Sequence, residues 1–281
     1  MPELPEVESV REGLSQLIIN EEIARVEVLW NNIIESPDVQ SFKERLVGQK
    51  FERVDRRGKF LLFYLSEDVL ISHLRMEGKY QYKKIADEKE NLEKTKHKHV
   101  IFYLKSGYEL AYFDVRKFGR MSLVKKGEEF EHKSLKKLGP EPFSEDFKLE
   151  EMRELLKRRT KAIKGVLLDQ KLVVGIGNIY ADEILFQSKI YPARAANELS
   201  KDEENILYYS IIEILSKAVK QGGTTIRSYE NAFGENGNYQ EYLKVYGKEG
   251  EDCPRCGSKI EKTKIVGRGS HFCPNCQEVK K

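Results

Sequence analysis

Two short motifs, Cys253-Pro-Arg-Cys256 and Cys273-Pro-Asn-Cys276, decide how the last part of this chain folds. Their spacing, C-x2-C-x16-C-x2-C, allows each motif to place two thiolates on one tight turn. The residues between the motifs are enough for a β-hairpin that brings the two turns together. Four thiolates complete a tetrahedral zinc site and leave no position for water, so the pattern predicts one structural zinc ion. A redox-active cysteine pair is the alternative, and two equivalent turns fit it poorly.

An arginine, Arg268, lies between two glycines in the middle of the predicted hairpin. It is either an ordinary exposed residue at the hairpin tip or a cation aimed at a phosphate group. Residues 244–281 carry nine Lys or Arg against five Asp or Glu, and residues 117–137 are also rich in basic side chains. Basic stretches of this kind are either solvated surface or phosphate contacts.

From about Leu138 onward, the sequence upstream of the cysteines has a helical pattern. Helices are expected over residues 150–159, 163–168, 178–187 and 200–220. The last helix begins with a capping box, Ser200 with Glu203, and ends before Gly222-Gly223. We expect one face of this helix to consist of Ile206, Ser210, Ile211, Ile214 and Ala218.

A glycine-containing stretch, Val174-Gly-Ile-Gly-Asn178, precedes the helix expected at 178–187. With Asn178 as the N-cap, the backbone N–H groups at this helix start would form a natural phosphate site. The stretch is neither a P-loop nor a dinucleotide-binding fingerprint, because no Gly-Lys-Ser/Thr and no third glycine follow. A plain connector between two helices is the alternative reading.

The first half of the chain consists of short segments rich in β-branched and aromatic residues, which favours a sandwich of two β-sheets. A helix is expected over residues 39–46, and the polar segment 83–98 is expected to be an exposed loop. Strands are expected over residues 23–30, 51–56, 60–65, 69–74, 100–104, 109–115 and 121–124. The expected fold class is α+β, with an N-terminal helix and sandwich followed by a helical region and a hairpin.

The chain opens Met1-Pro2-Glu3-Leu-Pro-Glu6, and this start combines a possible nucleophile with two acids. Trimming of Met1 would leave Pro2 with a free secondary amine, which has a larger unprotonated fraction near neutrality than lysine has. Such an amine can attack an aldehyde-level carbon and form an iminium that needs no proton to be cationic. Glu3 and Glu6 are candidate proton-transfer groups. The alternative is an ordinary helix start with a proline and acids in its first turn.

Three turns in the strand-rich half carry side chains that suit contact with nucleic acid. Lys59 follows an Arg-Arg-Gly turn. A lysine at such a position is more often an ordinary exposed residue of a β-turn than a functional one. Met76 lies shortly after His73 in a loop; such a methionine is more often core filler, but beside basic residues it can wedge between base pairs. Arg116 and Phe118 share one turn and suit probing or stacking on bases.

Length and charge limit the number of domains and the classes of partner that the chain can have. The chain has 281 residues, which predicts two domains, and a formal net charge of +3 from 49 Lys or Arg against 46 Asp or Glu. This weak positive charge permits a nucleic-acid partner without requiring one. The sequence has no apolar stretch of membrane-spanning length and no signal-peptide pattern, so we expect a cytoplasmic protein.

Six of these motifs, in this order, resemble the formamidopyrimidine-DNA glycosylases, bacterial repair enzymes that excise oxidised purines, and the resemblance extends from Pro2 to Gln277. The motifs are PELPE at 2–6, Lys59 after RRG, DVRKFG at 114–119, VGIGNIY at 174–180, GGTT at 222–225 and the four cysteines. Two small departures are Gly165, where the family commonly has proline, and Ser270, where it commonly has threonine.

The resemblance implies a domain organisation and a set of partners. A catalytic β-sandwich would occupy residues 1–132, a helix-two-turn-helix domain 133–223, a lesion-capping loop and connector 224–246, and a zinc finger 247–281. It also implies one structural Zn²⁺ and no organic cofactor. The partner would be double-stranded DNA with oxidised purines or abasic sites, bound by a nucleoid-associated monomer.

The resemblance also implies a mechanism. Pro2 would attack C1′ of the damaged nucleotide and form an imine, with Glu3 as acid and Glu6 as a further candidate for proton transfer. Cleavage of the strand by β- and δ-elimination would follow, with Lys59 as proton donor for the first step and Arg268 for the second. The expected DNA-binding residues are His73, Met76, His97, Arg116, Phe118, Arg159 and Asn178. The expected lesion-binding residues are Glu77, Thr224, Thr225, Ile226, Arg227, Ser228 and Tyr229.

Two other functions stay open at this point. A related branch of the superfamily prefers oxidised pyrimidines, and Leu4 together with residues 222–229 argues against it. A non-catalytic zinc-ribbon protein that only binds DNA would keep the same architecture. The presence of Pro2, Glu3 and Lys59 argues against that reading.

Overall fold

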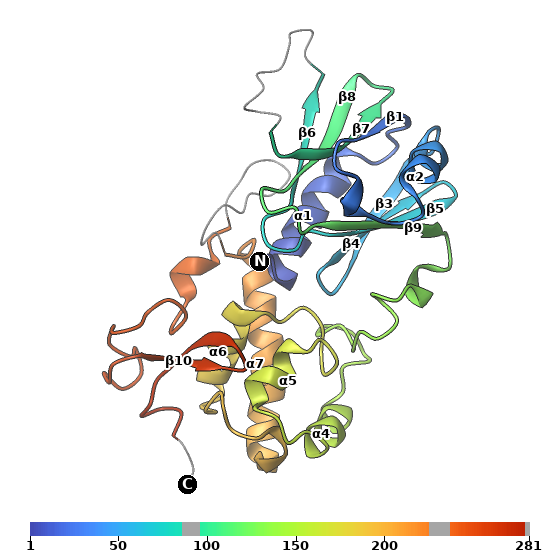
Figure 1. Cartoon of the computed structure of the whole chain (residues 1–281). Helices are drawn as coiled ribbons and strands as arrows, with labels where there is room; N and C mark the ends of the chain where they lie inside the picture. Colours follow the sequence, from blue (N-terminus) through green and yellow to red (C-terminus); the bar gives the residue numbers. More distant parts are fainter. Residues whose placement is uncertain (86–95, 225–236, 279–281) are drawn as a thin grey trace. The chain divides into compact units, whose positions relative to one another are not determined.

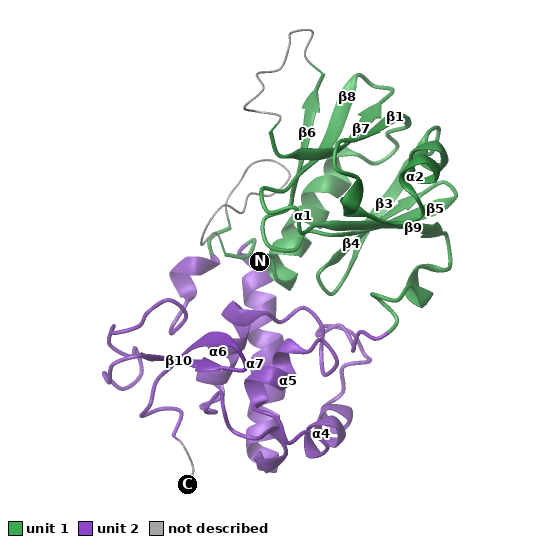
Figure 2. Ribbon diagram, in the orientation of Figure 1, with its two compact units in different colours: residues 1–136, 222–238 green, residues 137–221, 239–281 purple. Residues whose placement is uncertain are grey.

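The computed structural model describes residues 1–85, 96–224 and 237–278. They form two compact units (Figures 1 and 2). Unit 1 comprises residues 1–136 and 222–238, and unit 2 comprises residues 137–221 and 239–281. Unit 1 is therefore built from two separate stretches of sequence, and each unit has its own hydrophobic core.

Unit 1 contains a sandwich of two β-sheets, which confirms the predicted fold class. One sheet has the antiparallel order β1-β7-β8-β6; the other has the order β2-β9-β5-β4-β3, in which β2 and β9 run parallel. The strands of the first sheet are β1 (Ile23–Val28), β7 (Lys98–Leu104), β8 (Tyr108–Phe113) and β6 (Lys79–Lys84). Those of the second are β2 (Ile34–Ser36), β9 (Arg120–Lys125), β5 (Asp68–His73), β4 (Phe60–Leu65) and β3 (Phe51–Arg57).

Helix α1 (Leu4–Leu17) belongs to the core of the sandwich. Its side chains Val7 and Leu14 are fully buried and share one cluster with residues of both sheets. Phe51 of β3 connects the two sheets, because its ring lies 6.4 Å from that of Phe102 in β7. The helical spacing of the apolar residues thus fixes which face of α1 is buried, and with it the position of the chain's first residues. The other helices among the described residues of this unit are α2 (Val39–Leu46), η1 (Asn31–Ile33) and η2 (Glu129–Glu131).

Two strands and one buried lysine differ from the sequence-based expectation. Strand β2 has only three residues, and β6 is an edge strand of composition KYQYKK, so neither gives a strong hydrophobic alternation. Part of the segment expected to be an exposed loop is therefore sheet. Lys98 at its end is 4% exposed, because its Nζ lies 2.7 Å from Oε1 of Glu109 on the neighbouring strand.

Tyr112 of β8 lies beneath two turns of the sandwich. A Cβ atom at Gly78 would lie 2.1 Å from the Tyr112 hydroxyl oxygen, and one at Gly119 would lie 1.9 Å from it. Only glycine allows the backbone to approach the hydroxyl this closely. The first turn carries Met76 and the second carries Phe118. The buried Tyr112 side chain therefore determines how closely the backbones of both turns approach β8.

Unit 2 is mainly helical and ends in the predicted hairpin. Its core is formed by side chains of the four α-helices together with Tyr239 and Leu243. The hairpin strands pair Ile265 with Arg268 across a two-residue turn. The elements are α4 (Leu149–Lys157), α5 (Ile163–Leu168), α6 (Asn178–Gln187), η3 (Ala196–Glu198), α7 (Lys201–Lys220), η4 (Tyr239–Tyr242), β10 (Glu261–Ile265) and β11 (Arg268–Phe272).

Two details of the helices correct the sequence-based expectation. Gly177, not Asn178, is the N-cap of α6, so Asn178 is the first helical residue. In α7 the capping box of Ser200 is present, but Ile206 is 49% exposed while Leu207 beside it is fully buried. The predicted face is therefore rotated slightly from the true one. Across the described ranges, none of the helices combines the length and the apolar character needed to cross a membrane.

We expect Tyr112→Phe to leave the free energy of unfolding unchanged or to increase it. The buried Tyr112 hydroxyl has no hydrogen-bond partner among the described residues, so its removal breaks no bond. Tyr80→Phe is the matched control: its ring is 5.1 Å from that of Tyr112, and its hydroxyl donates to Ser72 Oγ at 2.7 Å. Loss of that bond should cost about 1 kcal/mol.

Urea unfolding of both variants, followed through Trp30, the single tryptophan of the chain, measures the difference. A destabilisation at Tyr112 as large as that at Tyr80 would show that the Tyr112 hydroxyl has a hydrogen-bond partner after all.

Candidate active site

The start of α1 is held by the carboxylate of Glu6. Its Oε2 accepts a hydrogen bond from the Glu3 backbone N–H at 2.7 Å, and its Oε1 accepts from Thr224 N and Oγ1 at 2.7 and 3.0 Å. Glu3 and Glu6 are each 2% exposed, and Pro2 is buried beside them. Gly223 is required here, because a Cβ atom would lie 2.7 Å from Glu6 Oε1. The Glu6 carboxylate therefore connects Glu3, the neighbour of the candidate nucleophile Pro2, to Thr224, the one described residue of the predicted lesion-binding segment from Thr224 to Tyr229.

The turn that carries Lys59 is tied to the same helix. Gly58 and Lys59 form a two-residue turn between β3 and β4, with Gly58 at a φ of 57°. Arg56 donates to Gly58 O at 3.0 Å and to Glu8 Oε2 of α1 at 2.8 Å. Burial acts to raise the pKa of Glu8, but its bonds to Arg56 and Arg11 outweigh this, and the pKa lies below its usual value. Lys59 itself is only 7% exposed.

His73, at the end of β5, is a neutral hydrogen-bonding group. Its Nδ1 accepts from the Arg75 backbone N–H at 2.9 Å, which places the ring proton on Nε2 as a donor. Burial, followed by the positive charges of Arg75 and Lys59, lowers the pKa of His73 to about 3. Phe60 packs edge-on against the ring at 4.5 Å. His73 can therefore donate one hydrogen bond without adding charge.

The turn with Arg116 and Phe118 is organised by the buried carboxylate of Asp114. It accepts the backbone N–H groups of Arg116, Phe118 and Gly119 at 3.0, 2.8 and 2.7 Å. The Arg116 guanidinium lies 4.8 Å from the centre of the Phe118 ring, and Phe118 is 46% exposed. The turn thus presents a paired cation and aromatic ring on a rigid backbone.

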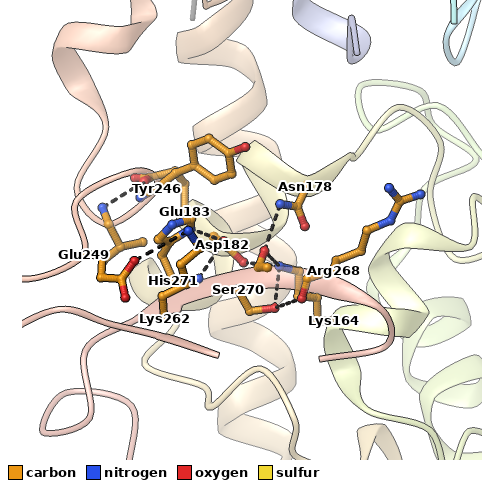
Figure 3. A network of polar contacts seen from close by, with 12 residues as sticks. Lys164, Asn178, Asp182, Glu183, Tyr246, Glu249, Lys262, Arg268, Ser270 and His271 are labelled. Carbon is orange, nitrogen blue, oxygen red and sulfur yellow. Dashed lines mark hydrogen bonds and ion pairs between the residues drawn. The ribbon is translucent and has the colours of Figure 1, made fainter. Parts of the chain in front are cut away.

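In unit 2 a buried ion pair joins two helices to the hairpin (Figure 3). Lys164 Nζ of α5 lies 2.6 Å from Asp182 Oδ1 of α6, and both side chains are 0% exposed. The same ammonium donates to Gly269 O at 3.1 Å and to Ser270 Oγ at 2.7 Å. Asp182 Oδ2 accepts the His271 backbone N–H at 2.9 Å. One pair of charges therefore fixes β11 on α5 and α6.

Arg268 and Asn178 lie at the edge of this network. Asn178 Nδ2 donates to Gly269 O at 2.9 Å. Arg268 is exposed, and its guanidinium extends away from the network in Figure 3. Within the described part of the chain, no hydrogen bond or ion pair involves its side chain. The tip of the hairpin is Val266-Gly267, so Arg268 is the first residue of β11 and not the tip residue that the sequence predicts.

Glu183 holds the segment that leads to the zinc-binding motifs. Its two carboxylate oxygens accept the consecutive backbone N–H groups of Lys244, Val245 and Tyr246, each at 2.9 Å. Burial raises the pKa of Glu183, and the three N–H donors offset this only in part. The Tyr246 ring then packs against His271, 5.0 Å between ring centres, so this segment also contacts β11.

The other predicted residues are placed as follows. Met76 and Glu77 are half-buried in the turn after β5, and His97 is half-buried, with its carbonyl accepting the Asp114 N–H at 3.0 Å. Arg159 is half-buried and lies 4.0 Å from Asp169. Thr225, Ile226, Arg227, Ser228 and Tyr229 lie outside the described residues.

The four cysteines have the geometry of a tetrahedral zinc site. Their Sγ atoms all lie within 4.8 Å of one another. Cys253 and Cys276 are 3.9 Å apart, and Cys256 and Cys273 are 3.5 Å apart, measured between sulfur atoms. Zinc–sulfur bonds of about 2.3 Å in a tetrahedron give edges of roughly 3.8 Å, which these distances match.

Comparison with known proteins assigns all three parts of the chain to domains found in one glycosylase family. Residues 1–121 match the family model of the formamidopyrimidine-DNA glycosylase N-terminal domain, residues 138–230 match its H2TH domain, and residues 250–279 match the zinc finger found in FPG and IleRS. A formamidopyrimidine-DNA glycosylase of Enterococcus faecalis is 51% identical over 280 residues, which is 100% of this chain and 98% of the relative.

The chain belongs to the formamidopyrimidine-DNA glycosylase family. Its four cysteines accordingly bind one structural zinc ion.

Solved structures of this glycosylase family share the whole fold. The Lactococcus lactis Fpg in complex with an abasic site containing DNA has a TM-score of 0.91 and 43% identity, covering 99% of this chain and 100% of that chain. A mutant of the same protein, in complex with a Fapy-dG containing DNA, has a TM-score of 0.92 at the same identity and coverage.

The structure also reveals residues whose roles the sequence motifs do not indicate, chiefly Lys164, Asp182, Asp114 and Tyr112. Lys164 and Asp182 are charged residues on apolar helix faces, and that break in the hydrophobic pattern was a readable signal. Asp114 precedes a turn, where its side chain commonly accepts backbone N–H groups. For Tyr112 no motif gives a signal, because its contacts with Gly78 and Gly119 depend on how the two turns fold over β8.

Stability should fall with acidification in a way that depends on His73. The unfolded chain binds a proton at this side chain near pH 6.5, whereas the folded protein does so only near pH 3, so protonation favours unfolding between these values. The free energy of unfolding should decrease by up to roughly 1.4 kcal/mol per pH unit below about pH 6.5. His73→Asn should reduce this slope.

Urea unfolding between about pH 7 and pH 5 measures the slope. His132→Asn is the control. His132 is only half-buried, and although burial lowers its pKa, the Glu35 carboxylate opposes this, so the variant should reduce the slope less. Equal slopes in the wild type and in His73→Asn would show that His73 is protonated in the folded state.

Removal of zinc should unfold the hairpin and leave unit 1 intact. The hairpin cluster around Phe186, Val245 and Ile260 is small, so the metal supplies much of its folding free energy. Chelation, or Cys253→Ser, should therefore increase proteolysis within residues 250–279 while Trp30 fluorescence stays unchanged. Restoration by added zinc is the control. A hairpin that stays protease-resistant without metal would contradict the structural role.

Proposed function

We propose that this DNA glycosylase of base-excision repair excises oxidised purines, including 8-oxoguanine and formamidopyrimidines, from duplex DNA through an imine on Pro2, and then cuts the strand. The observation that carries the proposal is the environment of Pro2. It precedes α1 directly, it is buried, and the backbone of its neighbour Glu3 is fixed by Glu6. A nucleophile held in this way loses little conformational freedom when it attacks.

In the proposed chemistry the Pro2 nitrogen bonds to C1′ of the damaged nucleotide while the bond from C1′ to the base breaks, and the proton lost from the Pro2 amine goes to the departing base. Glu3 donates a proton to the sugar ring oxygen as the ring opens, which leaves a cationic iminium. The iminium acidifies C2′, so loss of a C2′ proton expels the 3′ phosphate in β-elimination. Loss of a C4′ proton then expels the 5′ phosphate in δ-elimination, and water hydrolyses the imine to regenerate Pro2.

The basic residues are proposed to act on the phosphates. Lys59, held by the Arg56 bond to Gly58, is the proton donor for β-elimination, and Arg268 is the donor for δ-elimination and a phosphate clamp. The uncharged His73 ring donates a hydrogen bond to the DNA backbone. Arg116, Phe118 and Met76 fill the space that the extruded nucleotide leaves, because a base must leave the stack before its C1′ is accessible. The zinc ion shapes the hairpin and takes no part in bond breaking.

The preference for purines is proposed to lie in Glu77 and in the segment from Thr224 to Tyr229. An oxidised guanine carries a hydrogen at N7 where guanine has a lone pair. A carbonyl group placed there gains a hydrogen bond from the lesion but faces an acceptor in the normal base. That contact would discriminate by roughly 1–3 kcal/mol.

Pro2→Gly should lose most of the complex that borohydride traps on lesion-containing duplex, while binding of the duplex persists. The imine of a glycine amine is cationic only when it is protonated, whereas the iminium of proline needs no proton. Pro5→Ala, a proline substitution three residues further on, is the matched control and should still trap. Trapping that survives in Pro2→Gly but disappears in Lys59→Ala would identify Lys59 as the nucleophile. A wild-type protein that binds duplex and never traps would instead be a binding protein only.

The alternative candidate function is excision of oxidised pyrimidines. Rates on 8-oxoguanine, thymine glycol and abasic duplexes distinguish the two. We expect 8-oxoguanine to be excised faster than thymine glycol, and deletion of residues 225–228 to slow 8-oxoguanine excision far more than cleavage at the abasic site, which needs no base contact. Faster removal of thymine glycol would favour the pyrimidine-directed function.

A further inference from the structure

The hairpin turn that precedes Arg268 is strained. Its two central residues, Val266 and Gly267, have φ angles of 46° and 76°. A two-residue hairpin turn with both φ angles positive favours Asn-Gly or Gly-Gly, because these residues tolerate the left-handed region. A β-branched residue such as valine is a conformational outlier there. The turn therefore holds Val266 in a backbone conformation that the residue itself disfavours.

The Val266 side chain packs on α5. A Cβ atom at Gly165 would lie 3.1 Å from Val266 Cγ1 and 3.7 Å from its Cγ2, so the valine methyl groups lie directly over the glycine. Val266 is otherwise 52% exposed. A Cβ atom at position 165 would push the valine methyl groups away by a few tenths of an ångström, so glycine allows the contact as it stands.

The neighbouring residue of α5 holds the other side of the same turn. Lys164 donates to Gly269 O and to Ser270 Oγ, both in β11. Consecutive residues of one helix thus contact the hairpin on either side of Arg268: Gly165 through Val266, and Lys164 through Gly269. Arg268 is exposed and its side chain makes no polar contact with any described residue, so only its backbone neighbours determine where it points.

We propose that the contact of Val266 with Gly165 is a positioning device that sets the direction of Arg268. This inference rests on the proposed role of Arg268 at the phosphate. The strained turn persists because the valine methyl groups fit over Gly165, and this fit fixes the last two residues before Arg268. Residues 165 and 266 touch no reacting group; they act through the backbone of the turn.

The test is a double-mutant cycle in the zinc-loaded, full-length protein. Gly165→Ala adds a methyl group against Val266 and should shift the turn. On abasic duplex we expect the second cut, δ-elimination, to slow by roughly tenfold, while the first cut and borohydride trapping change less than twofold. Gly165→Ala combined with Val266→Ala removes the clash and should restore the second cut to within about twofold of Val266→Ala alone.

Val266→Asn separates positioning from stability. Asparagine relieves the strained turn, so the hairpin should become more resistant to thermal unfolding and to zinc loss. Because the methyl groups over Gly165 are gone, the second cut should nevertheless slow. A purely structural role for Val266 predicts the opposite, with a more stable hairpin and an equal or faster second cut.

Two controls distinguish failure of this inference from failure of the proposed function. If Arg268→Ala leaves the second cut unchanged, the role of Arg268 is wrong. In that case ¹⁵N relaxation of the Gly267 and Arg268 amides still tests the contact, since Gly165→Ala should make both more mobile. An unchanged second cut and unchanged relaxation in Gly165→Ala, with full zinc content, would overturn the proposal. So would effects of Gly165→Ala and Val266→Ala that simply multiply in the double variant, because two residues that act through one contact must be coupled.

Discussion

Buried carboxylates that accept backbone N–H groups are the constraint on which both units depend. In unit 1 these are Glu6 and Asp114, and in unit 2 they are Asp182 and Glu183. A carboxylate removed from water is costly unless its oxygens are hydrogen-bonded, so each of these acids imposes one arrangement on the segment that it binds. The segments held in this way carry or adjoin candidate site residues. Arg116, Phe118 and Arg268 have exposed side chains, whereas Pro2 and Glu3 are buried, and in each segment the carboxylate fixes the backbone.

This constraint explains how much of the structure could be predicted from sequence. The strands, helices and zinc motifs follow local rules of periodicity and spacing, and those predictions are confirmed for the fold class and the metal site. Strand β6 escapes them because an edge strand with three lysines lacks the apolar alternation of a core strand. The candidate residues Lys59 and Arg116 were predictable from their turns. Their supports were not. Arg56 bonds to Glu8, which is distant in sequence, and the packing of Tyr112 against Gly78 and Gly119 follows from the tertiary fold and from no local rule.

Two local rules of protein structure are broken in this chain, each beside a segment proposed to contact DNA. The Tyr112 hydroxyl is buried without a partner among the described residues, beneath the turns that carry Met76 and Phe118. Val266 occupies the left-handed region immediately before Gly267 and Arg268. Sequences usually agree with their folds at every level, and exceptions concentrate at sites where geometry is needed for function. These two exceptions lie beside segments that the motifs also indicate, although the described residues hold others elsewhere, such as Lys189 with a φ of 57°.

The bond between Glu6 and Thr224 has a consequence for biogenesis. The two residues are 218 positions apart, and the chain completes most of unit 2 between leaving unit 1 and returning to it. At a synthesis rate of about 5–20 residues per second, the sandwich of residues 1–136 waits several seconds for the stretch that completes it. During that interval the Glu6 carboxylate lacks its Thr224 donors and depends on water. The start of α1, which carries Pro2, thus reaches its final form only after nearly the whole protein has been synthesised.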